Sequence, residues 1–192
     1  MAFNDKSGFG ETLLVSAGSE PVDPLGWRCV TRVDKWNEAD LGGAPYETLT
    51  HVGNLRLIGG ASLFWERAIT KVPSGSATGA ALQALSSDNA VIGVSSGTGA
   101  AAKTQTALQT TGTKFYSSMT TGWPAHTDGT SSSGQQDCVF KASFGTTKAN
   151  VAWREWAVAN SSGGRHINRA VSNLGTKATG TWTITVTLTE TT

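Results

Sequence analysis

The sequence predicts an all-β fold, an antiparallel β-sandwich of jelly-roll type with long Gly/Ser/Thr loops and a small N-terminal extension. The chain's 27 Thr, 19 Ser and 23 Gly make up 69 of its 192 residues, a composition typical of strands joined by turn-rich loops. Segments that alternate apolar and polar residues recur, whereas helix signals are scarce. Seven Trp residues and a net charge of only +1 indicate a packed domain rather than a disordered chain.

The first two thirds of the chain contain short runs of β-branched and aromatic residues, which predict strands of modest length. In chain order these predicted strands cover 11–16, 27–34, 47–52, 54–58, 62–70, 89–94 and 113–120. Two segments, 77–86 and 100–108, carry weak helix signals. The Thr and Gln content of the second leaves it without an apolar stripe.

Turn signals divide the later part of the chain into further strands. Residues 136–144 alternate in polarity and form the next predicted strand. The Gly-rich segment 145–149 predicts a hairpin loop to the strand that follows it. A second turn, at 160–164, leads into a short predicted strand at 166–171.

Residues 150–159 are predicted to form one strand with two distinct faces. Period two places Arg154 and Trp156 on one face and Trp153 and Glu155 on the other. Neighbours on a strand point in opposite directions, so Arg154 and Glu155 cannot form a catalytic pair with each other. Arg154 is interpreted as a buried or stacked structural residue.

The clearest predicted strand is 181–189, where Thr alternates with large apolar residues. Trp182, Ile184, Val186 and Leu188 share one face, which we expect to lie in the core, while the Thr residues face outward.

The Pro/Gly/Ser stretch at 73–80 suggests a boundary within the chain. Charged residues are frequent before it, and the Gly/Ser/Thr content rises after it. We therefore expect an N-terminal segment at 1–72 with short strands and an interface arm, a connecting stretch at 73–87, and a C-terminal β-domain at 88–192.

Several classes of protein are excluded by simple features. No run of 18 apolar residues exists, and the first residues lack the basic and apolar regions of a signal peptide. We expect a cytosolic protein whose Cys29 and Cys138 stay reduced. The near-neutral charge without basic clusters predicts neither a nucleic-acid nor a membrane partner.

Two motifs suggest chemistry, and neither has a suitable context. Gly-Val-Ser-Ser-Gly at 93–97 matches the hydrolase pattern around Ser95, but no good helix opening follows it. The stretch 97–104 resembles a phosphate loop, yet Ala102 stands where Gly must precede the Lys. Both are interpreted as surface or structural segments.

The histidines offer no metal or cofactor site. His51, His126 and His166 are isolated in the sequence, and only His126 has a carboxylate close by, at Asp128. We expect that pair to be part of a solvated loop, and the protein to be a non-enzyme with no cofactor.

Four residues are candidates for a protein interface because they are large and lie in loops or near the N-terminus. They are Phe3, Phe9, Trp123 and Pro124. We expect residues 1–10 to order on a neighbouring chain. Trp153, Trp156 and Trp182 are assigned to the core.

From about residue 88 a series of short motifs runs along the chain: Ile-Gly at 92–93, Thr-Ala-Leu at 106–108, the Phe-rich 139–144, Trp-Arg-Glu at 153–155, the Gly-Gly turn at 160–164, Ile-Asn-Arg at 167–169, Gly-Thr-Lys at 175–177 and the Thr-rich terminal strand. The order of these motifs resembles a family of tailed-bacteriophage virion proteins related to tail-collar and fibre domains. Ala157 replaces the usual Gly, and Ala159 stands where Phe is common.

The resemblance implies a non-enzymatic structural part of a virion, assembled in the host cytoplasm. Within it, the leading hypothesis is a capsid decoration (cement) protein that clamps adjacent copies of the major capsid protein, as a homotrimer. A tail or fibre-attachment protein that docks to tail proteins is the alternative. A carbohydrate-binding or hydrolytic module, acting through Ser95 or a groove lined by Trp123, is the third.

Overall fold

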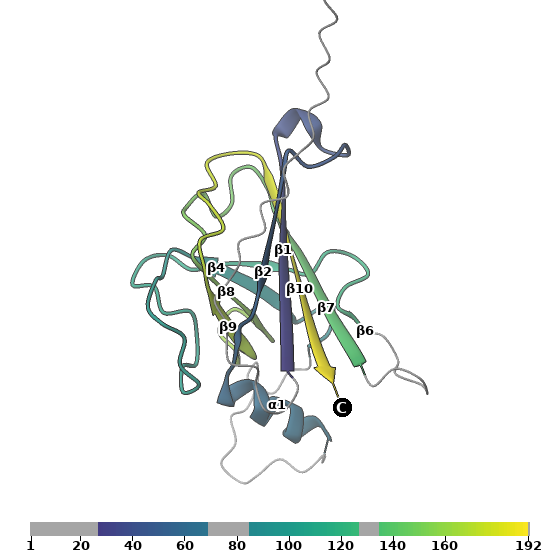
Figure 1. Ribbon diagram of the computed structural model, residues 1–192, viewed down its shortest axis with the longest axis vertical. Coiled ribbons are helices and arrows are strands. Elements are labelled where there is room, and N and C mark those ends of the chain that lie inside the picture. Colours follow the sequence, from purple (N-terminus) through teal and green to yellow (C-terminus); the bar gives the residue numbers. More distant parts are fainter. Residues whose placement is uncertain (1–26, 69–84, 127–134, 192) are drawn as a thin grey trace, which may run out of the picture.

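The computed structural model describes residues 27–68, 85–126 and 135–191, and it confirms the predicted fold class (Figure 1). Two five-stranded antiparallel sheets form a β-sandwich around a shared apolar core. One α-helix and one short 3-10 helix are the only helices in these ranges, and neither is long and apolar enough to cross a membrane.

The first sheet is built around the C-terminal strand. Its order is β2 (Glu47–Val52), β1 (Trp27–Trp36), β10 (Thr181–Thr191), β7 (Gln135–Phe144) and β6 (Ala125–His126). Strand β10 pairs with β1 along ten residues on one side and with β7 along ten on the other. The predicted strand 181–189 is therefore the central strand of this sheet.

The second sheet lies behind the first in Figure 1. Its order is β3 (Leu55–Arg56), β9 (Asn168–Val171), β8 (Glu155–Ala159), β4 (Val91–Ser95) and β5 (Phe115–Ser118). Strands β8 and β9 form a hairpin across the predicted turn at 160–164. The strands predicted at 27–34, 47–52, 54–58, 89–94, 113–120 and 166–171 thus all exist, with small changes at their ends.

The predicted facing of β10 is confirmed for its apolar residues, whereas Thr183 and Thr189, expected to face outward, are buried by hydrogen-bonded neighbours on β7. Trp182, Ile184, Val186 and Leu188 are at most 4% exposed and belong to the core between the sheets. Trp153 and Trp156, also predicted to be core residues, are fully buried. Their apolar surface stabilises the sandwich through the hydrophobic effect.

The strand predicted at 62–70 is wrong over its described part, because residues 62–68 are helical. Helix α1 covers Ile58–Ala68, and its buried Leu63 packs into the core. A short apolar run does not distinguish strand from helix, and the two glycines in the first turn of α1 hide its helical character. Residues 100–108, which carry a weak helix signal, form an irregular loop with a turn at 103–104 instead.

The strand predicted at 150–159 begins only at Glu155, and 145–149 is not a hairpin loop. Strand β7 lies in one sheet and β8 in the other, so the intervening residues cross between the sheets. Trp153 and Trp156 are both buried, so strict alternation does not extend through 153–156. Arg154 is consequently exposed, and its prediction as a buried or stacked residue is wrong.

The strands before residue 72 complete the same two sheets as those after residue 88. Strand β1 lies between β2 and β10, and β3 pairs with β9. The described strands on either side of the stretch at 73–87 therefore belong to one sandwich. Phe3, Phe9, the predicted strand 11–16 and most of the helical signal at 77–86 lie outside the described residues.

Candidate functional site

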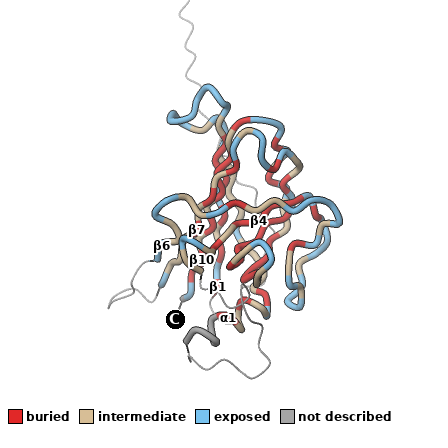
Figure 2. Tube along the Cα trace, turned by 180° about the vertical axis from the view of Figure 1, so that it is seen from behind, coloured by how far each residue is buried: buried red, intermediate tan, exposed pale blue. Residues whose placement is uncertain are grey.

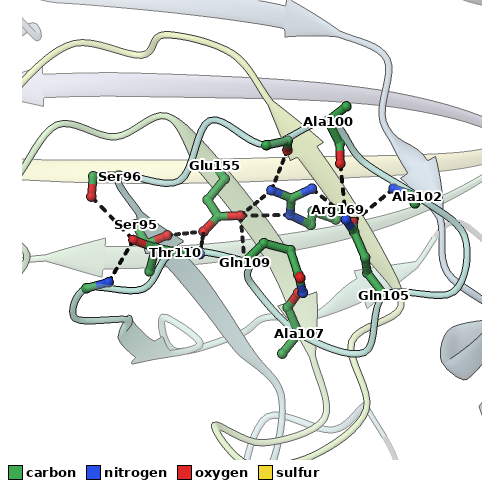
Figure 3. Close-up of polar contacts among 12 residues, drawn as sticks. Ser95, Ser96, Ala100, Ala102, Gln105, Ala107, Gln109, Thr110, Glu155 and Arg169 are labelled. Atoms are coloured by element: carbon green, nitrogen blue, oxygen red, sulfur yellow. Dashed lines mark hydrogen bonds and ion pairs between the residues drawn. The ribbon is translucent and has the colours of Figure 1, made fainter.

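A buried ion pair joins the two strands of the β8–β9 hairpin. Glu155 begins β8 and Arg169 lies within β9, and both side chains are fully buried. The guanidinium Nε lies 2.7 Å and Nη2 lies 2.6 Å from Oε2 of the carboxylate. Figure 3 shows this pair at the centre of a polar cluster. The pair was not predicted, because period two alone does not show which strands are neighbours.

Glu155 accepts further hydrogen bonds from β4 and from the segment that follows it. Ser95 Oγ–H donates to Oε1, and the backbone N–H groups of Thr110 and Gln109 donate to Oε1 at 2.8 Å and Oε2 at 2.9 Å. Burial raises the pKa of the Glu155 carboxyl, but these hydrogen bonds and Arg169 favour the charged form more strongly, so the pKa lies below its ordinary value.

Arg169 extends the cluster to the loop at 96–110. Its Nη1 donates to Gln105 Oε1 at 2.9 Å, and Nη2 donates to the carbonyl of Gly99 at 2.8 Å. The side chain of Gln105 in turn bonds to backbone groups of Ala100 and Ala102 (Figure 3). One buried pair therefore holds a long loop against the second sheet.

This geometry gives the Gly-x-Ser-x-Gly pattern a structural role. Ser95 is fully buried, is the last residue of an antiparallel strand, and has its hydroxyl directed at Glu155. Gly97 lies so close to the same carboxylate that any Cβ would overlap it. The pattern thus packs a loop around a charge, and the strand-to-helix turn that exposes a nucleophile is not formed.

The three histidines lie apart from one another. His51 on β2 contacts Trp156 edge-on, with ring centroids 5.0 Å apart, and His126 is exposed on β6. No group of three His, Cys, Asp or Glu side chains that could hold a metal occurs among the described residues. Asp128, noted beside His126, lies outside them.

His166 is buried, whereas His51 is half-buried and His126 is exposed. Its Nε2 lies 3.1 Å from the hydroxyl of Tyr116, and its Nδ1 lies 3.3 Å from the carbonyl of Gly164. Burial lowers the pKa of His166 to about 4, so the ring is neutral at pH 7.

The two cysteines are free, as predicted. Cys29 on β1 and Cys138 on β7 lie on opposite sides of β10, since both are in register with Leu188. Burial raises the pKa of the Cys29 thiol to about 12, and burial also raises that of Cys138. Neither thiol is activated as a nucleophile.

Trp123 and Pro124 line a recess beside β6 and β7. This recess has a volume of about 440 Å³ and also contacts Leu85, His126 and Cys138. Trp123 is half-buried, and the Lys141 ammonium lies 5.9 Å from its ring centroid. A second recess of about 290 Å³ shares the same three residues.

The second recess is more enclosed than the first, and it lies against strands β1, β7 and β10 of the first sheet. It is lined by Trp27, Leu85, His126, Gln136, Asp137, Cys138, Phe140, Leu188 and Glu190. Its lining is largely apolar and includes two carboxylates, those of Asp137 and Glu190. Trp123 and Pro124 line the first recess and not the second, and their role in a protein interface stays a prediction.

Comparison of the chain with protein-family models, curated proteins and solved structures gives no match. What the chain does is therefore inferred from its own residues. The features available for that inference include the buried Glu155–Arg169 cluster and the two recesses beside β7.

Proposed function

We propose that the chain is a structural protein of a tailed-bacteriophage virion, and specifically a decoration protein that stabilises the head by clamping adjacent copies of the major capsid protein. A homotrimer is the assembly we propose for it. Support for this function comes from where the residues of the sequence resemblance lie in the fold.

The observation that carries the proposal is that these separate motifs meet in one interior cluster. Glu155 comes from the Trp-Arg-Glu motif and Arg169 from Ile-Asn-Arg, and they form the buried ion pair. Leu108 ends the Thr-Ala-Leu motif and is fully buried, and Gly93 packs against it and Tyr116. Motifs that depend on one another for packing indicate a shared architecture, whereas a chance match of composition would scatter them.

The remaining motifs form a second set of interior contacts. Lys177, from Gly-Thr-Lys, is 1% exposed and donates to the carbonyl of Gly145 at 2.8 Å and to Asn150 Oδ1 at 2.7 Å. Phe144, from the Phe-rich strand, packs edge-on against Trp153 with centroids 4.9 Å apart. The resemblance therefore extends through both sheets, which supports a protein built as a rigid scaffold.

Immunolabelling of intact particles tests the proposal. Label spread over the head supports a decoration protein, and label confined to the tail supports the alternative of a tail or fibre-attachment protein. Label found on no purified particle would contradict both.

The Trp123 recess is the one observation that favours a carbohydrate-binding module. An aromatic face beside polar groups suits a sugar ring. Glycan-array binding that disappears in Trp123→Ala would support this function. This function would be contradicted if the wild-type chain bound no glycan on the array and Ser95→Ala left hydrolytic activity unchanged.

A further inference from the structure

The loop between β1 and β2 projects beyond the end of the sandwich (Figures 1 and 2). We call residues 37–46 the hairpin knob. Every residue in it is exposed except the half-buried Pro45. Sequence reasoning did not single it out, because nothing in the sequence shows that a loop projects.

The knob has a fixed shape despite its exposure. The backbone N–H of Asp40 donates to Asn37 at 3.1 Å, and that of Gly43 donates to Asp40 at 3.0 Å, around the 3-10 turn at Glu38–Asp40. At its base, the indole N–H of Trp36 donates to the Gly43 carbonyl at 3.0 Å. A preorganised loop loses little conformational entropy when it binds.

The knob combines large apolar side chains with carboxylates. Leu41 and Tyr46 are 56% and 54% exposed, so half of the four large exposed hydrophobic residues of the described chain lie here. Glu38 and Asp40 are also exposed. Lys35, at the base, does not offset them, because it is buried against Trp182 and already paired with Glu47 at 2.9 Å.

We propose that the hairpin knob is the element by which the protein docks, inserting Leu41 and Tyr46 into an apolar recess ringed by Lys and Arg on a neighbouring virion protein. This inference rests on the proposed function. Exposed aromatic and aliphatic anchors supply affinity at protein interfaces, and complementary charge supplies orientation. The knob's carboxylates would repel the phosphates of a nucleic acid or an anionic membrane.

A second copy of the chain fits the knob poorly. No lysine or arginine lines either of the two recesses described above, and one of them carries Asp137 and Glu190. Lys141 lies 5.9 Å from the Trp123 ring, and one lysine does not surround a recess with positive charge. Like charges would therefore face each other if the knob of one copy entered such a recess on another.

The test measures binding of the full-length protein to purified particles of its virus prepared without it. Leu41→Ser and Tyr46→Ser should each weaken binding at least about tenfold, as removal of an interface anchor does. Ile58→Ser is the matched control, because Ile58 is 58% exposed and begins α1, the helix at the opposite end of the molecule (Figure 1). Its binding should equal that of the wild type.

Charge is tested separately with Asp40→Lys and the control Asp88→Lys, since both carboxylates are exposed. Wild-type binding should weaken as salt rises, and Asp40→Lys should lower affinity and reduce that salt dependence. Equal melting temperatures of all variants show that folding is unaffected.

Two results would overturn the inference while leaving the proposed function intact. One is wild-type binding that no knob variant weakens. The other is a knob variant that dissociates an oligomer of the chain itself without changing particle binding. A wild-type protein that neither binds particles nor is found in them would instead overturn the proposed function, and the inference with it.

Discussion

Among single residues, Glu155 and Arg169 impose the strictest requirement on the fold. Each ion loses its water on folding, and that cost is recovered only if every charged atom finds a partner. The carboxylate has Ser95, two backbone N–H groups and the guanidinium, while the guanidinium also bonds to Gln105 and Gly99. Removing either ion leaves the other buried without its counter-charge.

We therefore expect Arg169→Met to lower the free energy of unfolding by about 3–5 kcal/mol. Arg154→Met is the matched control, because Arg154 lies beside Glu155 in sequence yet is exposed. Its effect should stay within about 0.5 kcal/mol. Urea unfolding monitored by Trp fluorescence measures both, and an Arg169→Met protein as stable as the control would refute the role of the pair.

His166 predicts a defined dependence of stability on pH. Burial is the main cause that lowers its folded-state pKa to about 4 from 6.5, with Lys114 acting in the same direction and the Gly164 carbonyl opposing it. Between these pH values the unfolded chain binds a proton that the folded chain does not. The contribution of neutral His166 to the free energy of unfolding is therefore fully present above pH 6.5. This contribution falls by about 3 kcal/mol as the pH drops to 4.

The His166→Gln variant should lose this part of the pH dependence. His126→Gln is the control, since His126 is exposed. Chemical unfolding at a series of pH values between 4 and 7 measures the difference. A slope unchanged in His166→Gln would show that another group titrates in this range.

At the level of elements, α1 depends on a close approach to the β9 side of the second sheet. A Cβ added at Gly60 would overlap the backbone of Ile167, whereas one at Gly59 would lie 3.7 Å from the nearest atom, an ordinary contact. Ala favours a helix over Gly by about 1 kcal/mol. Gly59→Ala should thus stabilise the protein slightly.

Gly60→Ala should destabilise the protein by about 1–3 kcal/mol, because either the helix or the sheet must shift. Differential scanning calorimetry of the two variants gives the comparison. Equal melting temperatures for both would mean that α1 does not pack as described.

Strand β10 provides a second test at this level. Ile184→Asp should cost several kcal/mol, because it buries an unpaired charge in the core, and the protein should become insoluble. Thr185→Asp is the control. Residue 185 is half-buried on the other face and in register with Arg32 and Lys141, which favour a carboxylate. A soluble, folded Ile184→Asp protein would contradict the facing of β10.

Strands with clear alternation, such as 136–144 and 181–189, could be predicted because their period alone fixes which side chains enter the core. Helix α1 and the crossing between β7 and β8 could not be predicted from the sequence. The first has too short an apolar run, and the second depends on which sheet each strand joins, which is a long-range property. The sequence predicts nearly all of the strands and their order along the chain, but it does not show which strands pair with one another.

The polar cluster around Glu155 and Arg169 shows the same limit of prediction from the sequence. Ser95 and Glu155 were both recognised as chemically notable, but 60 residues separate them, and their contact requires the pairing of β4 with β8. Arg169 was known only as part of a motif. The resemblance indicated that these residues belong together, and the fold supplies the reason.

At the scale of the whole molecule, two sheets share one core, and we propose that contacts with other proteins lie at the ends of this scaffold. The hairpin knob projects at one end, and α1 lies at the other (Figure 1). A protein that clamps neighbours needs such a scaffold, because a stable core lets exposed loops carry the binding.

The number of copies of this protein in purified particles, measured by quantitative mass spectrometry against the major capsid protein, tests the central claim most directly. A decoration protein should be present in hundreds of copies, in a fixed ratio to the capsid subunit that reflects the symmetry of the head. A handful of copies per particle would place it on the tail, and its absence from particles would contradict a structural role in the virion.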